Sequence, residues 1–162
     1  MIFCKECMML SKGDIAPIFE LEGTPESKFG LNDLKGKRVI LAFYPGDWSP
    51  VCGDQMSLYN EILELFRNFN AQLIGISVDS KWSHKAFAED RHLAFPLLSD
   101  FEPKGALSRL YGAYDEMKGE SSRALFVIDE YGIIQWSYLS PDEINPGADG
   151  ILDALEELTI KK

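Results

Sequence analysis

Cysteine and histidine are scarce in this chain, which has three cysteines and two histidines among its 162 residues. An odd set of cysteines, Cys4, Cys7 and Cys52, does not suit a small secreted domain built on paired disulfides. No apolar run is long enough for a membrane span, and the patchy stretch 1–10 is too short and interrupted for a signal peptide. We therefore expect a cytoplasmic protein with no membrane partner.

Basic residues are also in the minority. The chain carries 16 Lys and Arg against 26 Asp and Glu, which gives a formal net charge of −10 and a pI near 4.6. This charge argues against nucleic acid or an anionic membrane surface as a partner. The length and the 46% hydrophobic content suit one globular domain with its own core. We expect a leader over residues 1–12 and a single domain over residues 13–162.

One stretch joins an expected strand to an expected helix and places a cysteine at the junction. Residues 38–44 form an apolar, strand-like run, and apolar residues recur at helical spacing over residues 52–69. Cys52 therefore falls in or just before the first helical turn. Unpaired backbone N–H groups and the positive end of the helix dipole favour a thiolate at such a place. The sequence thus predicts a nucleophilic cysteine.

The wider pattern predicts an α/β fold with a mixed central sheet flanked by helices. Strand 38–44, helix 52–69 and strand 72–78 form a βαβ unit with parallel strands. Turn residues at 129–132 lie between two apolar runs and indicate a closing hairpin. The other elements expected are an extended entry at 14–21, a turn at 23–26, a helical turn at 31–34, helices at 81–91, 103–111 and 148–158, and strands at 96–98, 124–128 and 133–138.

The spacing Pro45-x-x-x-Ser49-x-x-Cys52 resembles the active-site signature of the peroxiredoxins. The segment 72–79 is similar to the next strand of that family, and the segment 123–129 is similar to the strand that opens with its active-site arginine. The resemblance covers nearly the whole chain. It implies a thioredoxin-like fold with an N-terminal β-hairpin extension.

Two places where this family carries a second, resolving cysteine have no cysteine here. Relatives with a resolving cysteine five residues after the nucleophile would place it at position 57, which is Ser57. Other relatives carry it on a long C-terminal tail, whereas this chain ends at Lys162, soon after the last expected helix. The pattern therefore most resembles the one-cysteine, alkyl hydroperoxide reductase E type.

The resemblance implies a thiol peroxidase that reduces hydrogen peroxide and organic hydroperoxides. Cys52 would attack the peroxide and become a sulfenic acid, which a thiol donor such as thioredoxin or glutaredoxin would then reduce. Arg123 and the Ser49 hydroxyl would stabilise the thiolate and the peroxide oxygens. Pro45 would keep bulk water from the sulfur, and Gln55 would support Arg123. Because sulfur carries out the redox chemistry, we expect no cofactor and no metal, and family habit favours a homodimer.

The motif Cys4-Lys-Glu-Cys7 lies outside this pattern and leaves three interpretations open. The pair could resolve Cys52, form half of a zinc site shared between subunits, or belong to an inert leader. An alternative function is a thiol–disulfide oxidoreductase or redox sensor that uses Cys4 and Cys7. His84 and His92 have no evident carboxylate or cysteine partner at ligand spacing, so we expect both at the surface or in a supporting role.

Overall fold

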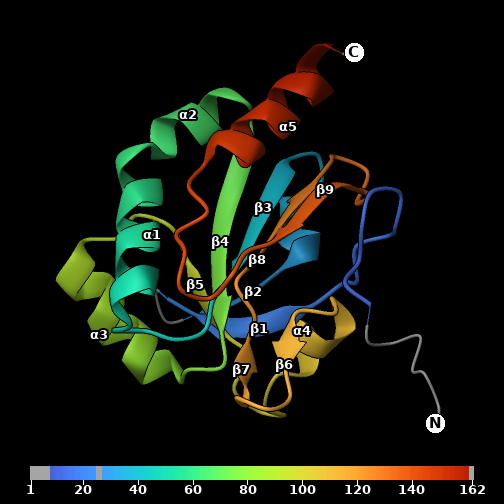
Figure 1. The fold of residues 1–162 in the computed structure, drawn as a ribbon. Helices are drawn as coiled ribbons and strands as arrows, with labels where there is room; N and C mark the ends of the chain where they lie inside the picture. Colours follow the sequence, from blue (N-terminus) through green and yellow to red (C-terminus); the bar gives the residue numbers. More distant parts are fainter. Residues whose placement is uncertain (1–7, 25–26, 161–162) are drawn as a thin grey trace, which may run out of the picture.

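The computed structural model describes residues 8–24 and 27–160, whose main sheet has seven strands in the order β2-β1-β5-β4-β3-β8-β9 (Figure 1). Strands β3, β4 and β5 run parallel, whereas β8 is antiparallel to β3 and β9 is antiparallel to β8. A small second sheet pairs β6 with β7. The strands are β1 (Glu20–Gly23), β2 (Ser27–Gly30), β3 (Arg38–Phe43), β4 (Ala71–Ser77), β5 (Leu97–Ser99), β6 (Tyr114–Asp115), β7 (Glu120–Ser121), β8 (Ala124–Ile128) and β9 (Ile134–Leu139).

The apolar runs of the sequence become the centre of the sheet. Every residue of β3 and of β8 is buried, as expected for strands that are covered on both faces. In the sheet register, Phe43 at the end of β3 lies opposite Ala124 at the start of β8 and beside Ile76 of β4. The predicted parallel pair of β3 and β4 and the predicted hairpin of β8 and β9 are both confirmed.

Helices cover both faces of this sheet, as the sequence predicted. In Figure 1, α1, α2 and α5 lie over one face of β3 and β4. On the other face, α4 and the segment before β1 contribute to the core. The helices are η2, a 3-10 helix (Leu31–Leu34), α1 (Pro50–Glu61), α2 (Leu63–Asn68), α3 (Lys81–Arg91), α4 (Ala106–Leu110) and α5 (Asp149–Ile160).

The single helix predicted over residues 52–69 is in fact two helices, α1 and α2. Ile62 separates them because its backbone leaves the helical conformation, with φ −104° and ψ 16°. Tyr59, Leu63 and Phe66 nevertheless enter the same core on either side of the break. Apolar periodicity continues across Ile62 and therefore could not reveal the interruption.

The helix predicted over residues 103–111 is shorter in the structure, where α4 begins at Ala106. The buried Asp100 carboxylate accepts the backbone N–H groups of Leu107 and Ser108 at 3.0 and 2.8 Å, and so binds the first turn of α4. A side chain that lies outside the helix thus satisfies its unpaired donors.

The N-terminal hairpin that precedes the central sheet is confirmed. Strands β1 and β2 pair antiparallel with Gly23 opposite Ser27, and β1 joins the edge of β5. Only the end of the extended entry predicted at residues 14–21 becomes a strand, while Ile15 forms an isolated bridge with Ile133.

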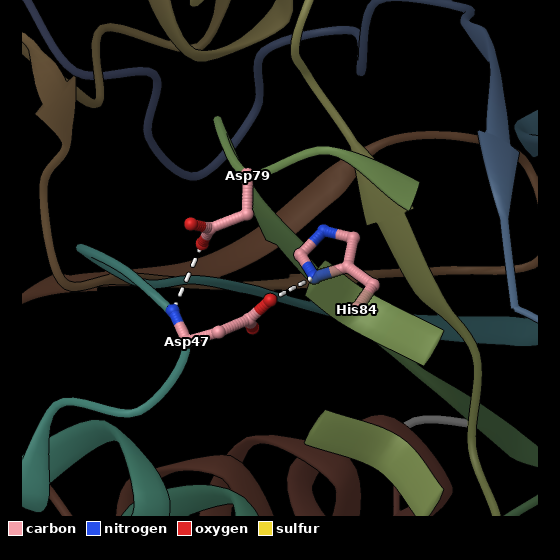
Figure 2. Close-up of side chains that lie close together, drawn as sticks. All are labelled: Asp47, Asp79 and His84. Atoms are coloured by element: carbon pink, nitrogen blue, oxygen red, sulfur yellow. Dashed lines mark hydrogen bonds and ion pairs between the residues drawn. The ribbon is translucent and has the colours of Figure 1, made fainter. Parts of the chain in front are cut away.

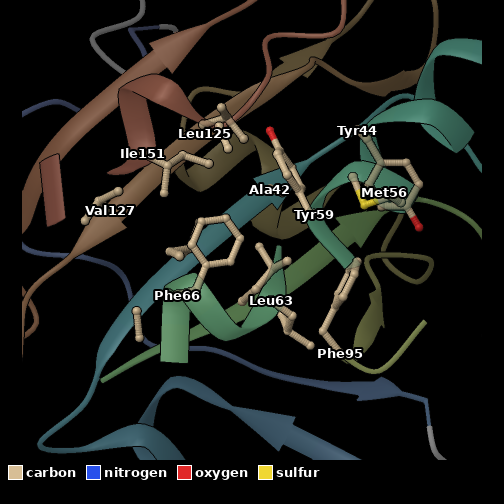
Figure 3. Packing of buried hydrophobic residues seen from close by; sticks show 14 of the residues in the cluster. Ala42, Tyr44, Met56, Tyr59, Leu63, Phe66, Phe95, Leu125, Val127 and Ile151 are labelled. Atoms are coloured by element: carbon tan, nitrogen blue, oxygen red, sulfur yellow. The ribbon is translucent and has the colours of Figure 1, made fainter. Parts of the chain in front are cut away.

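Two apolar cores lie on the two faces of the sheet because successive β3 residues point in opposite directions. Ile40 and Ala42 belong to the core under α1, α2 and α5, whereas Leu41 and Phe43 belong to the core beside α4. The first core also contains Tyr44, Cys52, Met56, Tyr59, Leu63, Phe66, Phe87, Phe95, Leu125, Val127, Ile151 and Leu155, several of which Figure 3 shows packed together.

The candidate site lies where β3 ends. Parallel strands end at one edge of the sheet, and open α/β folds bind ligands at that edge. The loop 44–49 leaves β3 here and leads into α1 (Figure 1). Among the described residues, no helix is both long and apolar enough to cross a membrane.

Candidate active site

Cys52 is the third residue of α1 and lies in its first turn, as predicted. Ser49 caps this helix with an extended backbone, φ −65° and ψ 137°, and its Oγ accepts the Cys52 backbone N–H over 3.5 Å. Pro50 is the first helical residue, where the lack of an N–H costs nothing and the fixed φ suits a helix. The loop sequence therefore starts the helix and places the cysteine at its positive end.

A buried cation lies against the sulfur. Cys52 is fully buried, and Arg123 is 1% exposed. Arg123 directly precedes β8 and directs its Nη1 group to Cys52 Sγ over 3.3 Å. Because a guanidinium stays charged and burial weakens screening, Arg123 places a full positive charge directly against the sulfur.

Neutral oxygen atoms hold Arg123 in place. Its Nη1 also donates to Gln55 Oε1 over 2.8 Å, and its Nε and Nη2 donate to the Asp142 backbone carbonyl over 3.1 and 2.7 Å. Within the described part of the chain, no ion pair involves Arg123. No carboxylate is therefore in direct contact with its positive charge, which lies against Cys52 Sγ.

Gln55 is oriented in turn by Tyr59, one helical turn further along α1. The Gln55 Nε2 group donates to the Tyr59 hydroxyl over 3.1 Å, and this hydroxyl donates to the Gly147 carbonyl over 2.9 Å. Burial raises the pKa of Tyr59 to about 12, against the smaller opposing effects of Gln55 and Arg123. Tyr59 thus stays protonated at neutral pH, and the amide oxygen of Gln55 keeps facing Arg123.

Two aromatic rings, one from the loop before α1 and one from α3, pack against each other. Trp48 is 51% exposed and packs edge-on against the buried Phe87, with ring centroids 5.4 Å apart. The Arg91 guanidinium lies 5.8 Å from the Phe87 centroid and also touches α1 beside Cys52. A side chain at Gly53 would prevent that approach, because its Cβ would lie 2.8 Å from Arg91 Nη2.

A surface position for His84 is wrong, and the carboxylate partner that the sequence did not reveal is present. The side chain is fully buried, and it has a carboxylate partner, since its Nδ1 lies 2.8 Å from Asp47 Oδ2 (Figure 2). The sequence separation of 37 residues hid this pair, because the loop after β3 meets α3 only in the folded chain. His92, in contrast, is exposed at the end of α3.

Asp47, Asp79 and His84 form a group whose potential metal-ligating atoms all lie within 4.8 Å of one another. Hydrogen bonds already use these atoms. The Asp47 backbone N–H donates to Asp79 Oδ2 over 2.8 Å, and the second ring nitrogen of His84 lies 3.0 Å from the Leu98 carbonyl oxygen. The group is thus a network of internal hydrogen bonds rather than an open set of ligands.

Four of the predicted site residues come together: Cys52, Ser49, Arg123 and Gln55 are linked by direct hydrogen bonds. Pro45 begins the same loop and is half-buried.

Cys4 and Cys7 lie outside the described residues. Tyr59 and the carbonyl of Asp142 were not predicted from the sequence. The spacing could have indicated Tyr59, since it follows Gln55 by four residues and residues four apart lie on the same face of a helix. A backbone carbonyl such as that of Asp142 carries no sequence signal.

The fold and this site define a class of protein. A thioredoxin-like sheet that presents a cysteine at a helix N-terminus beside a buried arginine belongs to a thiol-dependent oxidoreductase.

Comparison with known proteins gives the family. Residues 12–137 match the AhpC/TSA family. Alkyl hydroperoxide reductase E of Mycobacterium tuberculosis is 35% identical over 138 residues, which cover 84% of this chain and 90% of that protein. The chloroplastic peroxiredoxin Q of Triticum aestivum is 36% identical over 133 residues, or 82% of this chain and 60% of that protein. The chain therefore belongs to the AhpC/TSA family, the peroxiredoxins, and is a thiol-dependent peroxidase.

Solved structures agree with this assignment. The crystal structure of Enterococcus faecalis AhpC matches with a TM-score of 0.87 and 28% identity, over 94% of both chains. The reduced 2-Cys peroxiredoxin of Plasmodium vivax matches with a TM-score of 0.86 and 28% identity, over 93% of this chain and 83% of that chain.

Proposed function

We propose that Cys52 is the residue that reduces the peroxide. The observation that carries this proposal is the 3.3 Å contact between Arg123 Nη1 and Cys52 Sγ at the start of α1. The Cys52 thiolate attacks one oxygen of the peroxide, so that an S–O bond forms as the O–O bond breaks. The departing alkoxide or hydroxide takes up a proton and leaves as an alcohol or water, and the cysteine is left as a sulfenic acid.

Arg123 and Ser49 stabilise this reaction electrostatically. As charge moves from sulfur to the departing oxygen, the guanidinium can follow it without rearrangement, because Gln55 and Asp142 already fix its position. The Ser49 oxygen accepts the Cys52 N–H, so its own hydrogen can be donated to a peroxide oxygen. Pro45, at the start of the loop, limits the access of bulk water.

The substrates we propose are hydrogen peroxide and organic hydroperoxides. The similarity to proteins named alkyl hydroperoxide reductase E supports the second class. The full burial of Cys52 favours slender substrates whose peroxide group can reach the sulfur.

We propose that an external thiol, such as thioredoxin or glutaredoxin, reduces the sulfenic acid. Position 57 is Ser57, and Cys52 is the only cysteine among the described residues. A serine at that position leaves an external thiol as the donor that the one-cysteine pattern implies.

We also propose that the enzyme is a cytoplasmic homodimer. Exposed apolar side chains, including Trp48, Tyr138 and Leu139, supply surface that a second copy could cover. Sedimentation equilibrium tests this directly: a mass equal to a single chain at micromolar concentration would exclude the dimer.

Peptide mass spectrometry after one equivalent of hydrogen peroxide tests the proposal for Cys52. Cys52 of the reduced protein should be oxidised to the sulfenic acid, which is detected as its thioether with a dimedone probe, and Cys52→Ser should form no such adduct at position 52. A disulfide from Cys52 to Cys4 or Cys7 would keep Cys52 as the nucleophile and replace the external donor by an internal one. Oxidation of Cys4 and Cys7 with Cys52 untouched would refute the proposal.

A further inference from the structure

Asp47 is anchored more heavily than other residues of the loop between β3 and α1. Its Oδ1 accepts the Tyr44 hydroxyl over 2.7 Å, and its Oδ2 accepts the Ser83 hydroxyl over 2.9 Å and lies 2.8 Å from His84 Nδ1. Its backbone N–H donates to Asp79 (Figure 2). Both the side chain and the backbone of one loop residue are therefore fixed by residues that directly follow β3 and β4 and by α3.

The His84 ring lies between two oxygen atoms that act as acceptors. Nδ1 faces the Asp47 carboxylate, and Nε2 faces the Leu98 carbonyl of β5 over 3.0 Å. A neutral imidazole has one N–H group and one lone pair, so in either tautomer one nitrogen would direct its lone pair at an oxygen. The Tyr44 hydroxyl, 3.3 Å from Nδ1, directs its hydrogen to Asp47 instead. Both contacts become hydrogen bonds when His84 carries both protons.

We propose that His84 is a positioning residue for Cys52, held as an imidazolium that fixes Asp47 and with it the loop that starts α1. This proposal rests on the proposed role of Cys52. Asp47 precedes Trp48, whose φ of 69° is rare for a bulky residue, and Ser49, which caps α1. The anchored carboxylate holds the backbone in this turn, and the turn places the Ser49 hydroxyl on the Cys52 amide.

The charges around the ring support a cationic His84. Two carboxylates lie close to the ring: Asp47 from the loop before α1 and Asp79 from the segment after β4. The Tyr44 hydroxyl, directly after β3, binds Asp47. Burial, with the nearby Asp47 charge, raises the pKa of Tyr44 well above its usual range, so Tyr44 remains a neutral donor. Without the second ring proton, the buried Asp47 side chain and the half-buried Asp79 would have no cation between them, and one His84 nitrogen would face an acceptor with its lone pair.

The protonation state is measured on the wild-type enzyme by long-range ¹H–¹⁵N correlation NMR of the imidazole rings at about pH 7.5. His84 should show two protonated ring nitrogens. The variant His92→Asn assigns the two spin systems, and asparagine suits the left-handed backbone there, φ 53°. An unprotonated nitrogen on His84 would overturn the proposal, whether or not Cys52 reacts with peroxide.

The positioning role is measured as the rate constant of Cys52 oxidation, followed by tryptophan fluorescence in stopped flow. His84→Leu removes both donors and should lower this constant on the order of tenfold or more, because small misplacements of reacting groups have large effects. His84→Asn keeps an N–H near the Nδ1 position and should recover most of the loss. His92→Asn should match the wild type.

Equal rate constants for His84→Asn and His84→Leu, or a wild-type constant for His84→Leu, would refute the positioning role. If wild-type Cys52 itself does not react, the proposed function fails instead, and the NMR result still decides the protonation state. Should His84→Leu fail to fold, the rate constants of His84→Asn and His92→Asn are compared instead. If Cys52 oxidation in His84→Asn is more than about threefold slower than in His92→Asn, an N–H donor to Asp47 is not sufficient and the positioning role is refuted.

Discussion

Arg123 and Cys52 are 71 residues apart in sequence, and their side chains meet at 3.3 Å because of the sheet register. Phe43 lies opposite Ala124, so the chain that leaves β3 and the chain that enters β8 are at the same end of neighbouring strands. Arg123 directly precedes β8, and the loop after β3 leads to Cys52 within one turn of α1. Antiparallel pairing of β3 with β8 is thus what brings the cation to the sulfur.

Replacing Arg123 should remove most of the peroxidase activity without unfolding the protein. Arg123→Ala is expected to lower the rate constant of Cys52 oxidation by about 10²- to 10³-fold, the effect of losing one transition-state donor. Arg123→Lys should recover part of the loss, because lysine restores the charge but not the planar set of donors. The matched control is Arg67→Ala on the exposed face of α2. Wild-type kinetics in Arg123→Ala would exclude the assigned role.

The elements that could be predicted from the sequence are those with strong local signals. The strand 38–44, the helix 81–91 and the hairpin around residues 129–132 all follow from apolar spacing and turn residues, and the structure has each of them. The break at Ile62 has no such signal, because its neighbours keep helical apolar spacing on both sides.

The site divides in the same way. Cys52, Ser49 and Arg123 could be recognised because they lie in a fixed motif and at the start of a strand. The pairing of Asp47 with His84 joins a loop to a helix 37 residues away, and one histidine without its partner gives no indication of burial. The sequence could therefore not predict contacts between segments that come together only by tertiary packing.

Gln55 should affect activity through Arg123 rather than through the substrate. Gln55→Leu has a similar volume but no acceptor for Arg123 Nη1, so the guanidinium loses its 2.8 Å bond beside the sulfur. We expect a loss of about tenfold in the rate constant of Cys52 oxidation. Gln55→Glu keeps an acceptor oxygen and should retain more activity than Gln55→Leu. The reverse order in stopped-flow measurements would show that the acceptor is not the relevant feature.

The raised pKa of Tyr59 predicts that the folded protein loses stability at alkaline pH. Its pKa is raised from 10.0 to about 12 by burial, so folding favours the protonated hydroxyl. The stabilisation is complete below the unfolded-state pKa and is lost as the pH rises from about 10 to about 12, which amounts to about 2 to 3 kcal/mol. Urea unfolding across this range should show a smaller decline for Tyr59→Phe than for the wild type.

The control for this experiment is Tyr131→Phe, at a hydroxyl on the surface. Tyr131 is 85% exposed, so its replacement should leave the decline unchanged. At neutral pH, Tyr59→Phe should itself be less stable by about 1 to 3 kcal/mol, because Gly147 and Gln55 lose their partner in a buried place. An identical alkaline decline in Tyr59→Phe and the wild type would contradict the prediction.

Arg38 should matter for stability and not for chemistry. This buried residue of β3 donates from Nε to Glu130 Oε1 over 2.6 Å and from Nη1 to Thr159 Oγ1 over 2.9 Å, and so ties the turn before β9 and helix α5 to the sheet. Arg38→Met should lower the free energy of unfolding by about 3 to 5 kcal/mol, since it breaks the buried ion pair with Glu130 and removes the hydrogen bond to Thr159.

Glu130→Gln breaks the same ion pair from its other side, so the double variant should be less destabilised than the sum of the two single variants. The measurement is a double-mutant cycle by urea unfolding, with the rate constant of Cys52 oxidation recorded for each variant under conditions where it is fully folded. Additive free energies would show that the pair is not coupled. If the rate constant falls together with stability, the position of α5 also affects the active site. The connection would be Gly147, which precedes α5 and accepts the Tyr59 hydroxyl.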